Sequence, residues 1–185
     1  MSVGDTGRIG DGVIAAGAVT LRPWAPEDVV FVYDACQDAE VQRWTLVPRP
    51  YTAGDAVAFL ELSALGRVED AWAFFAITAT DTGELLGSIG LKEIEWDAGR
   101  AEGGYWVAPE ARGRGAATAA LAGLTAWAFE ALGLREVWLQ VARGNEGSQQ
   151  VAVRAGFQAD GVIPGGARDG DDLDDSLLFR RFAPA

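Results

Sequence analysis

Residues 112–117 form the stretch Arg112-Gly113-Arg114-Gly115-Ala116-Ala117, which stands between an apolar segment ending at Val107 and a long apolar-patterned segment running to Leu132. Glycines at a helix start let the backbone approach a ligand closely and adopt positive φ angles. The first-turn amides of a helix lack intrahelical partners, and the helix dipole favours negative charge there. The stretch therefore predicts an anion-binding turn, in which Arg112 and Arg114 can pair with phosphate oxygens.

Two common phosphate-binding motifs do not fit this turn. The P-loop ends in Gly-Lys-Ser/Thr, but the one lysine of the chain is Lys92. The dinucleotide motif finds its first two glycines at Gly113 and Gly115, but Thr118 stands in place of the third. The next apolar segment ends Gln140-Val141-Ala142-Arg143, without the acidic residue that would bind a ribose. From this turn alone, a glycine-rich loop without a ligand stays open as the alternative.

The segments before the turn have the composition of strands. Ala71–Thr80, Leu85–Ile94 and Ala101–Val107 are rich in apolar, β-branched and aromatic residues, and turn signals at 81–83 and 97–99 separate them. Because the turns are short, the sequence predicts three consecutive antiparallel strands.

Further elements are predicted on both sides of these strands. Helices are expected from Pro26, over Ala39–Trp44, after Thr52, from the 112–117 turn to Gly133 and over Asn145–Ala155. Strands are expected over Val19–Arg22, Val137–Val141, Phe157–Val162 and Leu177–Phe182. A loop is expected over 165–175. Residues 1–17 are predicted to form a flexible N-terminal tail, and residues 18–185 a single domain. The predicted fold class is α/β, with a mixed (α+β) sheet, an antiparallel first half and a central helix after the fourth strand.

Composition restricts the chemistry. The chain has no histidine, which excludes Ser-His-Asp triads, Cys-His dyads and the usual zinc sites, and we expect no metal. Cys36 is the single cysteine, so no internal disulfide forms, and a buried structural thiol is expected. A general base must then be a carboxylate, a tyrosine, Lys92 or a relayed water.

The charge and hydropathy of the chain indicate its partners and its cellular location. A net charge of −12, from 27 acidic and 15 basic residues, argues against nucleic acid as a partner. The same charge suits a cationic substrate, although solubility alone also explains it. We find no apolar run of membrane-spanning length and no signal-peptide pattern, so we expect a cytoplasmic protein without a membrane partner.

Taken further, Arg112-x-x-Gly115-x-Ala117 resembles the Arg/Gln-x-x-Gly-x-Gly/Ala pattern of the GNAT acetyltransferase superfamily, whose turn holds the pyrophosphate of acetyl-CoA. Other segments resemble the family in the same order along roughly residues 19–182. They are Leu21–Asp28, Gly87–Gly90 and Ala101–Val107, followed by Asn145-x-x-Ser148 with Gly156-Phe157, which is similar to the RimJ/RimL-like branch that acetylates protein N-termini. The resemblance implies a GNAT-like fold and an acyl-CoA cosubstrate.

The resemblance also implies a cofactor site made of Val107, Arg112, Gly113, Arg114, Gly115, Ala116, Ala117, Asn145 and Ser148. In the family the asparagine contacts the pantetheine arm, and the serine lies near the thioester sulfur. On its own, Asn145 reads as a helix N-cap, and both roles can coexist. Many relatives carry a tyrosine seven residues after this asparagine as the acid for the leaving thiolate. Here that position is Ala152, so Ser148 or a water takes the role.

Glu102 is the first candidate for the general base, because it lies on the strand that leads into the turn. A solvated carboxylate at a strand start is the alternative. Tyr105 is a weaker candidate, with a core residue as the alternative. Strand alternation places Glu102, Gly104 and Trp106 on one face and Tyr105 on the other, so Glu102 and Tyr105 are not expected to face the same pocket unless a bulge intervenes. Trp44 and the 48–51 loop are candidates for the wall of an acceptor pocket.

The resemblance thus implies an N-acetyltransferase that transfers an acetyl group from acetyl-CoA to a primary amine by direct attack in a ternary complex. The amine can belong to a protein N-terminus, a polyamine, or a small metabolite or antibiotic. The alternatives are a non-catalytic acyl-CoA-binding or regulatory module, and an acyltransferase with another donor such as succinyl-CoA. A monomer or a homodimer is expected.

Overall fold

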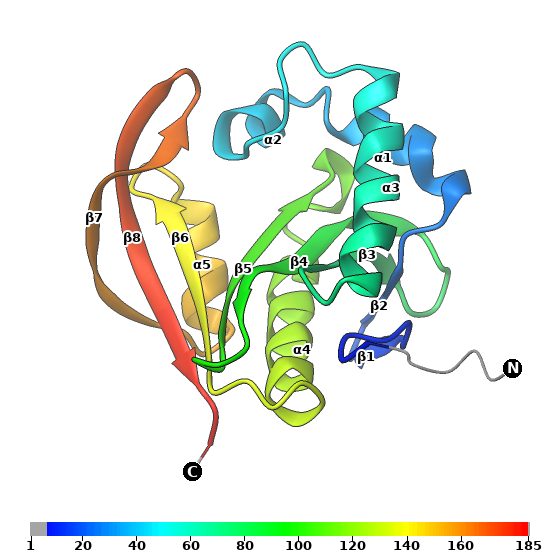
Figure 1. The fold of residues 1–185 in the computed structure, drawn as a ribbon. Coiled ribbons are helices and arrows are strands. Elements are labelled where there is room, and N and C mark those ends of the chain that lie inside the picture. The colour runs from blue at the N-terminus through cyan, green and yellow to red at the C-terminus, as the bar shows by residue number, and fades with distance from the viewer. Residues whose placement is uncertain (1–6, 185) are drawn as a thin grey trace, which may run out of the picture.

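Eight strands form one sheet in the computed structural model, which describes residues 7–184 of the chain (Figure 1). The strands are β1 (Ile14–Ala16), β2 (Val19–Pro23), β3 (Ala73–Ala79), β4 (Leu85–Glu95), β5 (Arg100–Val107), β6 (Glu136–Ala142), β7 (Gln158–Asp169) and β8 (Asp172–Phe182). Their order across the sheet is β1-β2-β3-β4-β5-β6-β8-β7. The sheet is mixed, as the sequence predicts.

The first half of the sheet is antiparallel from β1 to β5, which confirms the prediction. Gly83 and Gly99 lie in the turns after β3 and β4, with φ angles of 74° and 64°. Residues with side chains rarely adopt this backbone conformation, so glycine at these two positions lets the chain reverse within a few residues.

β5 and β6 run parallel, and they pair over a short stretch. Arg100–Glu102 of β5 faces Glu136–Trp138 of β6, while β6 pairs with β8 from Glu136 to Ala142. β5 itself stays paired with β4 as far as Val107. Within residues 7–184, the edge of β5 from residue 103 to 107 therefore has no strand beside it, and the sheet splits beyond Glu102.

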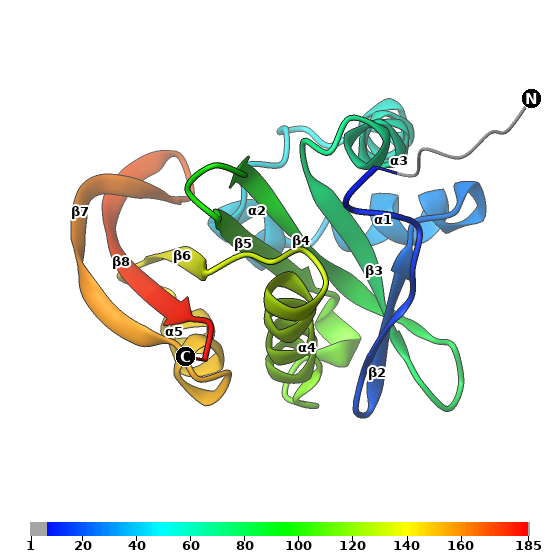
Figure 2. The same cartoon turned by 60° about the horizontal axis from the view of Figure 1, so that its bottom comes forward.

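Within the described part of the chain, five α-helices cover the sheet. They are α1 (Val29–Ala35), α2 (Ala39–Trp44), α3 (Ala53–Val68), α4 (Ala116–Glu130) and α5 (Glu146–Arg154). In Figure 2, α1 and α3 lie on one face of the sheet and α4 and α5 on the other. Leu121 and Leu124 of α4, the predicted central helix, are fully buried against the sheet. Among the described residues, we find no helix with the length and apolar character that crossing a membrane requires.

The predicted ends of the helices α3 and α4 are confirmed. The Thr52 hydroxyl accepts a hydrogen bond from the amide of Asp55 at 3.2 Å, and the Asp55 carboxylate accepts one from the Thr52 amide at 2.8 Å. This reciprocal pair caps α3. Gly133 follows α4 with a φ angle of 69°, and the next amide donates to the carbonyl of Ala128 at 3.0 Å. A left-handed glycine of this kind ends a helix.

The prediction of a loop over 165–175 is wrong. β7 and β8 continue through this stretch as a long hairpin, with Ala167 opposite Asp174 and Asp169 opposite Asp172. Glycine and aspartate have low strand propensity, but hydrogen bonding between two backbones does not require side chains, and tertiary pairing overrides the propensity. The hairpin turns at Gly170, where φ is 66°.

The prediction of a flexible tail over 1–17 is wrong for its second half. Ile14–Ala16 forms β1, and Ile9 is buried in the core. The amides of Arg8 and Ile9 each donate to the carboxylate of Asp70 at 3.0 Å, which holds this segment against the body of the fold. Because β1 adds one strand, the central helix follows the fifth strand of the chain. Residues 1–6 of the predicted tail lie outside the described residues.

Candidate active site

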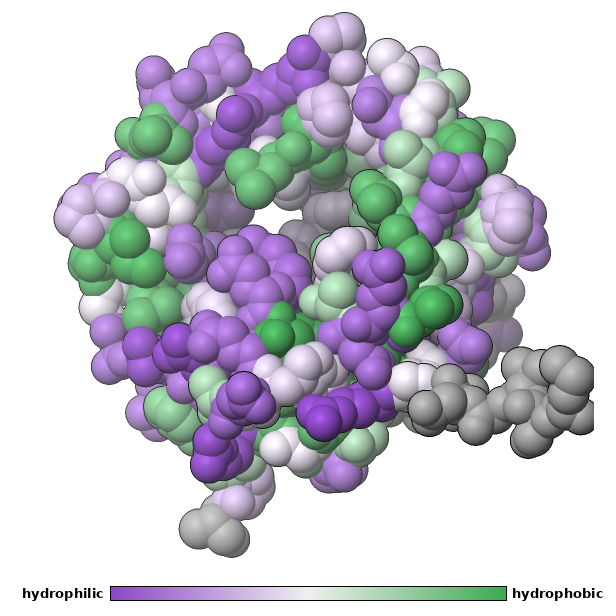
Figure 3. Space-filling view, viewed as in Figure 1, coloured by the Kyte–Doolittle hydropathy of each residue, from purple (hydrophilic) through white to green (hydrophobic). Residues whose placement is uncertain are grey.

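Two cavities meet where the sheet splits. The first, which we call the turn cavity, has a volume of about 580 Å³ and is lined by the 112–117 region and the start of α5. The second, the aromatic cavity, has a volume of about 720 Å³ and is lined by residues of α3, β4, β5 and the β7–β8 hairpin. Trp44, Thr45, Tyr105 and Trp106 line both cavities. The space-filling view shows a hollow at this place, below α2 (Figure 3).

The 112–117 turn has the backbone that an anion site requires. Gly113 and Gly115 have φ angles of 72° and 80°, and Gly115 is the N-cap of α4. A Cβ atom at either glycine would have no described atom within 4 Å, so the space beside the turn is open. Ala116 and Ala117 also line the turn cavity and keep the helix start uncrowded. The unpaired first-turn amides of α4 thus suit a phosphate group.

The two arginines of the turn lie differently. Arg112 lines the turn cavity and forms an ion pair with Asp38, the N-cap of α2. Burial raises the pKa of Asp38, but the Arg112 guanidinium and the Val41 amide lower it further, so the net pKa lies below its ordinary value. Arg114 instead pairs with both oxygens of Glu84 at 3.2 Å and does not line the cavity. The structure therefore places Arg112, but not the Arg114 side chain, at the predicted site.

The start of α5 forms the opposite wall of the turn cavity, which Val107 also lines. The Asn145 side-chain oxygen accepts a hydrogen bond from the amide of Ser148 at 3.0 Å, which confirms the predicted N-cap. Both residues line the cavity. The cap fixes the asparagine, and with it the first turn of α5, beside the open edge of β5.

A tyrosine–serine pair lies where the two cavities join. The Tyr105 hydroxyl is 2.7 Å from the Ser148 Oγ atom and donates to the Ser148 carbonyl at 3.2 Å. Burial raises the pKa of Tyr105 to about 12, although the Ser148 contact opposes this. The tyrosine is therefore protonated at neutral pH and can donate a proton. The sequence places Tyr105 on the strand face away from Glu102, and the contact of Tyr105 with Ser148, 43 residues further along the chain, has no local signal.

Glu102 is a buried carboxylate in the aromatic cavity, with 7% of the residue exposed. Its Oε1 atom is 2.9 Å from the Nζ atom of Lys92, which is directly opposite on β4. Burial raises the pKa of Glu102 above its ordinary value, and the Lys92 ammonium partly offsets the rise. The solvated strand-start alternative is thereby excluded. A carboxylate with a raised pKa is a stronger base than one in water.

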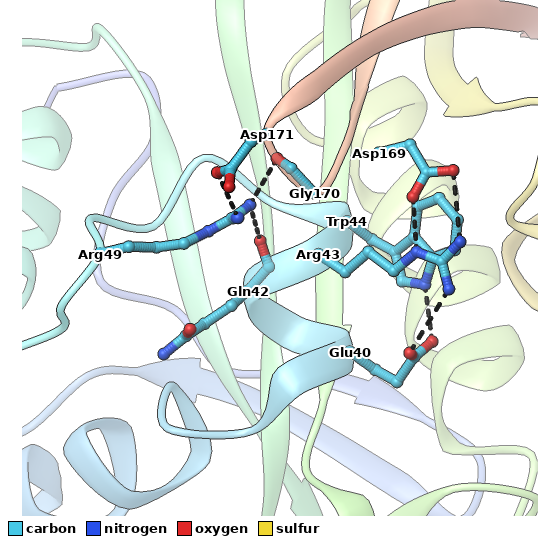
Figure 4. A network of polar contacts seen from close by, with 8 residues as sticks. All are labelled: Glu40, Gln42, Arg43, Trp44, Arg49, Asp169, Gly170 and Asp171. Atoms are coloured by element: carbon cyan, nitrogen blue, oxygen red, sulfur yellow. Dashed lines mark hydrogen bonds and ion pairs between the residues drawn. The ribbon is translucent and has the colours of Figure 1, made fainter.

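Two salt bridges join α2 and the segment after it to the tip of the β7–β8 hairpin (Figure 4). The Nε atom of Arg43 is 2.5 Å from Asp169, and the amide of Gly170 donates to the Arg43 carbonyl at 3.0 Å. Arg49 contacts Asp171 at 2.8 Å and donates to the Gly170 carbonyl at 2.7 Å. We call this contact the hairpin bridge. It links the two elements that flank the hollow.

Trp44 is held at the junction of the cavities by its neighbours. Its indole nitrogen donates to Glu40 at 2.8 Å, and the Arg43 guanidinium lies 4.3 Å from the ring centre. Trp44 and, from the 48–51 loop, Pro48 and Tyr51 line the aromatic cavity, and their role as the wall of an acceptor pocket stays a prediction. Cys36 is buried, and burial raises its pKa to about 11, so it is a structural thiol as predicted.

Comparison with known proteins identifies the family to which this fold and these paired cavities belong. Residues 18–158 match the family model described as "Acetyltransferase (GNAT) domain". The chain therefore belongs to the GNAT acetyltransferase family, as the sequence predicts, and it is an N-acetyltransferase.

Individual relatives have similar sequences or folds. The spermidine N(1)-acetyltransferase of Escherichia coli is 32% identical over 151 residues, which cover 80% of this chain and 77% of the relative. An uncharacterized N-acetyltransferase of Bacillus subtilis is 26% identical over 151 residues, which cover 82% of this chain and 85% of the relative. Mycobacterium smegmatis RimJ, solved in complex with CoA-disulfide, matches with a TM-score of 0.81 at 24% identity, over 93% of this chain and 86% of that chain.

Proposed function

We propose that this protein transfers the acetyl group of acetyl-CoA to a primary amine by direct attack within a ternary complex. The observation that carries the proposal is the meeting of two cavities at Tyr105 and Trp106. One cavity contains a helix start suited to phosphate groups, and the other contains a buried carboxylate. A donor and an acceptor held on the two sides react without a covalent enzyme intermediate, because positioning replaces the entropy of encounter.

The turn cavity suits CoA. The first-turn amides of α4 and the Arg112 guanidinium bind the pyrophosphate, with Gly113 and Gly115 allowing close approach. The unpaired edge of β5 from residue 103 to 107 offers backbone groups to the extended, amide-bearing arm of the cofactor, in the manner of an added strand. Asn145, which caps α5 beside this edge, contacts the same arm. The CoA-disulfide bound to Mycobacterium smegmatis RimJ supports this class of ligand.

Glu102 and the Ser148–Tyr105 pair divide the proton transfers. Glu102 accepts a proton from the attacking amine, directly or through a water, because burial has raised its pKa. The Ser148–Tyr105 pair donates a proton to the thiolate that leaves when the thioester bond breaks. Ala152 carries no hydroxyl, so this pair replaces the tyrosine that many relatives have at that position. In each acetyl transfer, one proton leaves the amine and one proton is delivered to the thiolate.

The relatives support a primary amine as the class of acceptor. The Escherichia coli relative is named a spermidine N(1)-acetyltransferase, and Asn145-x-x-Ser148 with Gly156-Phe157 resembles the RimJ/RimL-like branch that acetylates protein N-termini. A primary amine on a protein N-terminus, a polyamine or a small metabolite fits the proposal. Acetyl-CoA is the proposed donor, and the matching reaction with succinyl-CoA serves as the comparison.

The test is release of free CoA, measured with a chromogenic thiol reagent across a panel of primary amines. We expect amine-dependent release with acetyl-CoA, and mass spectrometry of the product shows an added acetyl group. Faster release of CoA from succinyl-CoA than from acetyl-CoA would identify succinyl-CoA as the donor instead. A chain that binds CoA but releases none with any amine would be a non-catalytic acyl-CoA-binding module.

Ser148→Ala is expected to lower kcat by about ten-fold, because the remaining Tyr105 hydroxyl still supplies a proton but loses its partner. The Kd for CoA, measured by calorimetry, changes less than the rate. The double variant with Tyr105→Phe loses little more than the more severe single variant, because the two hydroxyls act as one unit. An unchanged rate in Ser148→Ala would leave this serine as an ordinary residue of the helix start.

A further inference from the structure

The walls of the aromatic cavity are mostly apolar and come from three separate parts of the chain. Apart from glycines and alanines, most of its lining is aromatic or aliphatic, and the larger side chains include Trp44, Tyr51, Phe59, Leu62, Phe74 and Trp106. Phe59 packs against Phe74 with ring centres 5.9 Å apart. Binding to such a surface is favoured because it removes the carbon groups of a ligand from water.

The cavity provides one buried carboxylate. Glu102 lies in it with 7% of the residue exposed, and Lys92 is 2.9 Å away. Two other acidic residues of the lining are Asp55, whose carboxylate is occupied by the capping contacts with Thr52, and the exposed Glu93. The basic lining residues are Lys92 and Arg168. Glu102 can therefore receive one amine, but a second ammonium group further along the cavity meets no comparable partner.

The acidic segment 169–175 does not supply the missing partners. Asp169 pairs with Arg43, Asp171 with Arg49 and Asp175 with Arg143. None of its aspartates lines either cavity. Their negative charge is used in the hairpin bridge and on the outer surface.

Resting on the proposed function, we propose that the acceptor is a monoamine that carries an apolar group, and not a polyamine. The amine lies at Glu102, and its apolar group lies against the rings and aliphatic side chains of the aromatic cavity. A second ammonium group in this place would lose part of its hydration, and the carboxylates left for it are Asp55, which already accepts the Thr52 capping contacts, and the exposed Glu93. Two sources share this chemistry: a free aromatic or aliphatic amine, and a peptide whose first residue is apolar.

A matched pair of amines tests this directly. Hexylamine and cadaverine have chains of equal length, and a terminal methyl group in the first is replaced by an ammonium group in the second. We expect kcat/KM for hexylamine to exceed that for cadaverine by about ten-fold or more, and spermidine to be slower still. Phenylethylamine and a peptide with N-terminal Phe distinguish the sources: a higher kcat/KM for the peptide identifies a peptide acceptor, and a higher kcat/KM for the free amine identifies a small molecule.

Leu62→Asp gives the second readout, because Leu62 lines the cavity from α3 and is 52% exposed. The variant adds a carboxylate without a capping contact to the cavity wall, and we expect it to raise kcat/KM for cadaverine relative to hexylamine by about ten-fold. Val57→Asp is the matched control. Val57 is on the same helix and 46% exposed, does not line the cavity, and lies about 140° around the helix axis from Leu62. We expect Val57→Asp to leave the ratio of kcat/KM for cadaverine to that for hexylamine unchanged.

Two results would overturn the inference while leaving the proposed function intact. One is a wild-type protein that acetylates cadaverine or spermidine at least as fast as hexylamine. The other is an equal change of the substrate ratio in Leu62→Asp and Val57→Asp, which would show that the long-range field and not the cavity selects the substrate. Failure of the proposed function is a different result: no release of CoA with any amine of the panel.

Discussion

Glu102→Gln is expected to lower kcat by about 100-fold or more, with the Kd for CoA unchanged, because the amide cannot accept the proton of the attacking amine. Glutamine keeps the size of the side chain, so the aromatic cavity keeps its shape. Lys92, which has a side chain 37% exposed, stays solvated when its partner loses its charge. Stopped assays of CoA release at saturating amine give kcat, and calorimetry gives the affinity.

Glu95→Gln is the matched control for this variant. Glu95 also lies on an ion pair in the same part of the sheet, 2.9 Å from Arg100, but its side chain is 46% exposed and lines neither cavity. An exposed ion pair contributes about 0–1 kcal/mol, so this variant keeps both fold and rate. Equal loss of activity in both variants would show that Glu102 acts through stability and not as a base.

The pH profile gives an independent test of the same residue. The reaction needs Glu102 deprotonated, so the rate rises as pH increases through the pKa of Glu102, which burial has raised above its ordinary value. Lys92 lowers that pKa, and Lys92→Met therefore shifts the acidic limb of the profile to higher pH. Glu102→Gln removes the limb. An acidic limb that persists unchanged in both variants would assign it to another group.

The parts of the site that were predicted from sequence depend on local backbone geometry. Gly113 and Gly115 have the positive φ angles that a turn into a helix start requires, and Asn145 caps α5. The period of two along β5 placed Glu102, Gly104 and Trp106 on one face, and all three line the aromatic cavity. Each of these features is fixed by residues within a few positions of one another.

The parts that were missed depend on contacts between distant segments. Arg114 pairs with Glu84 across 30 residues, so its side chain does not point into the turn cavity. Tyr105 was placed on the face away from Glu102, yet it lines both cavities because the sheet splits beside it. The split depends on the residue at which the pairing between β5 and β6 ends while β6 remains paired with β8, and no local pattern in the sequence predicts that residue.

Gly115→Trp is expected to weaken CoA binding by more than about 100-fold, because an indole at the N-cap of α4 occupies the space where the pyrophosphate approaches the helix amides. The fold tolerates the side chain, since a Cβ atom at Gly115 has no described neighbour within 4 Å. The φ angle of 80° adds a strain of about 1–2 kcal/mol for a residue with a Cβ atom. Calorimetry with CoA measures the affinity, and thermal unfolding by circular dichroism measures the strain.

Gly133→Trp separates the two effects. Gly133 is at the other end of α4, has a φ angle of 69°, and a Cβ atom there also has no described neighbour within 4 Å. Because the backbone strain is the same, both variants lower the unfolding temperature to a similar extent, and only Gly115→Trp loses CoA. Retained CoA affinity in Gly115→Trp would place the phosphates away from the 112–117 turn. A loss of affinity in both variants would trace it to backbone strain in α4, and the phosphate site would then need another location.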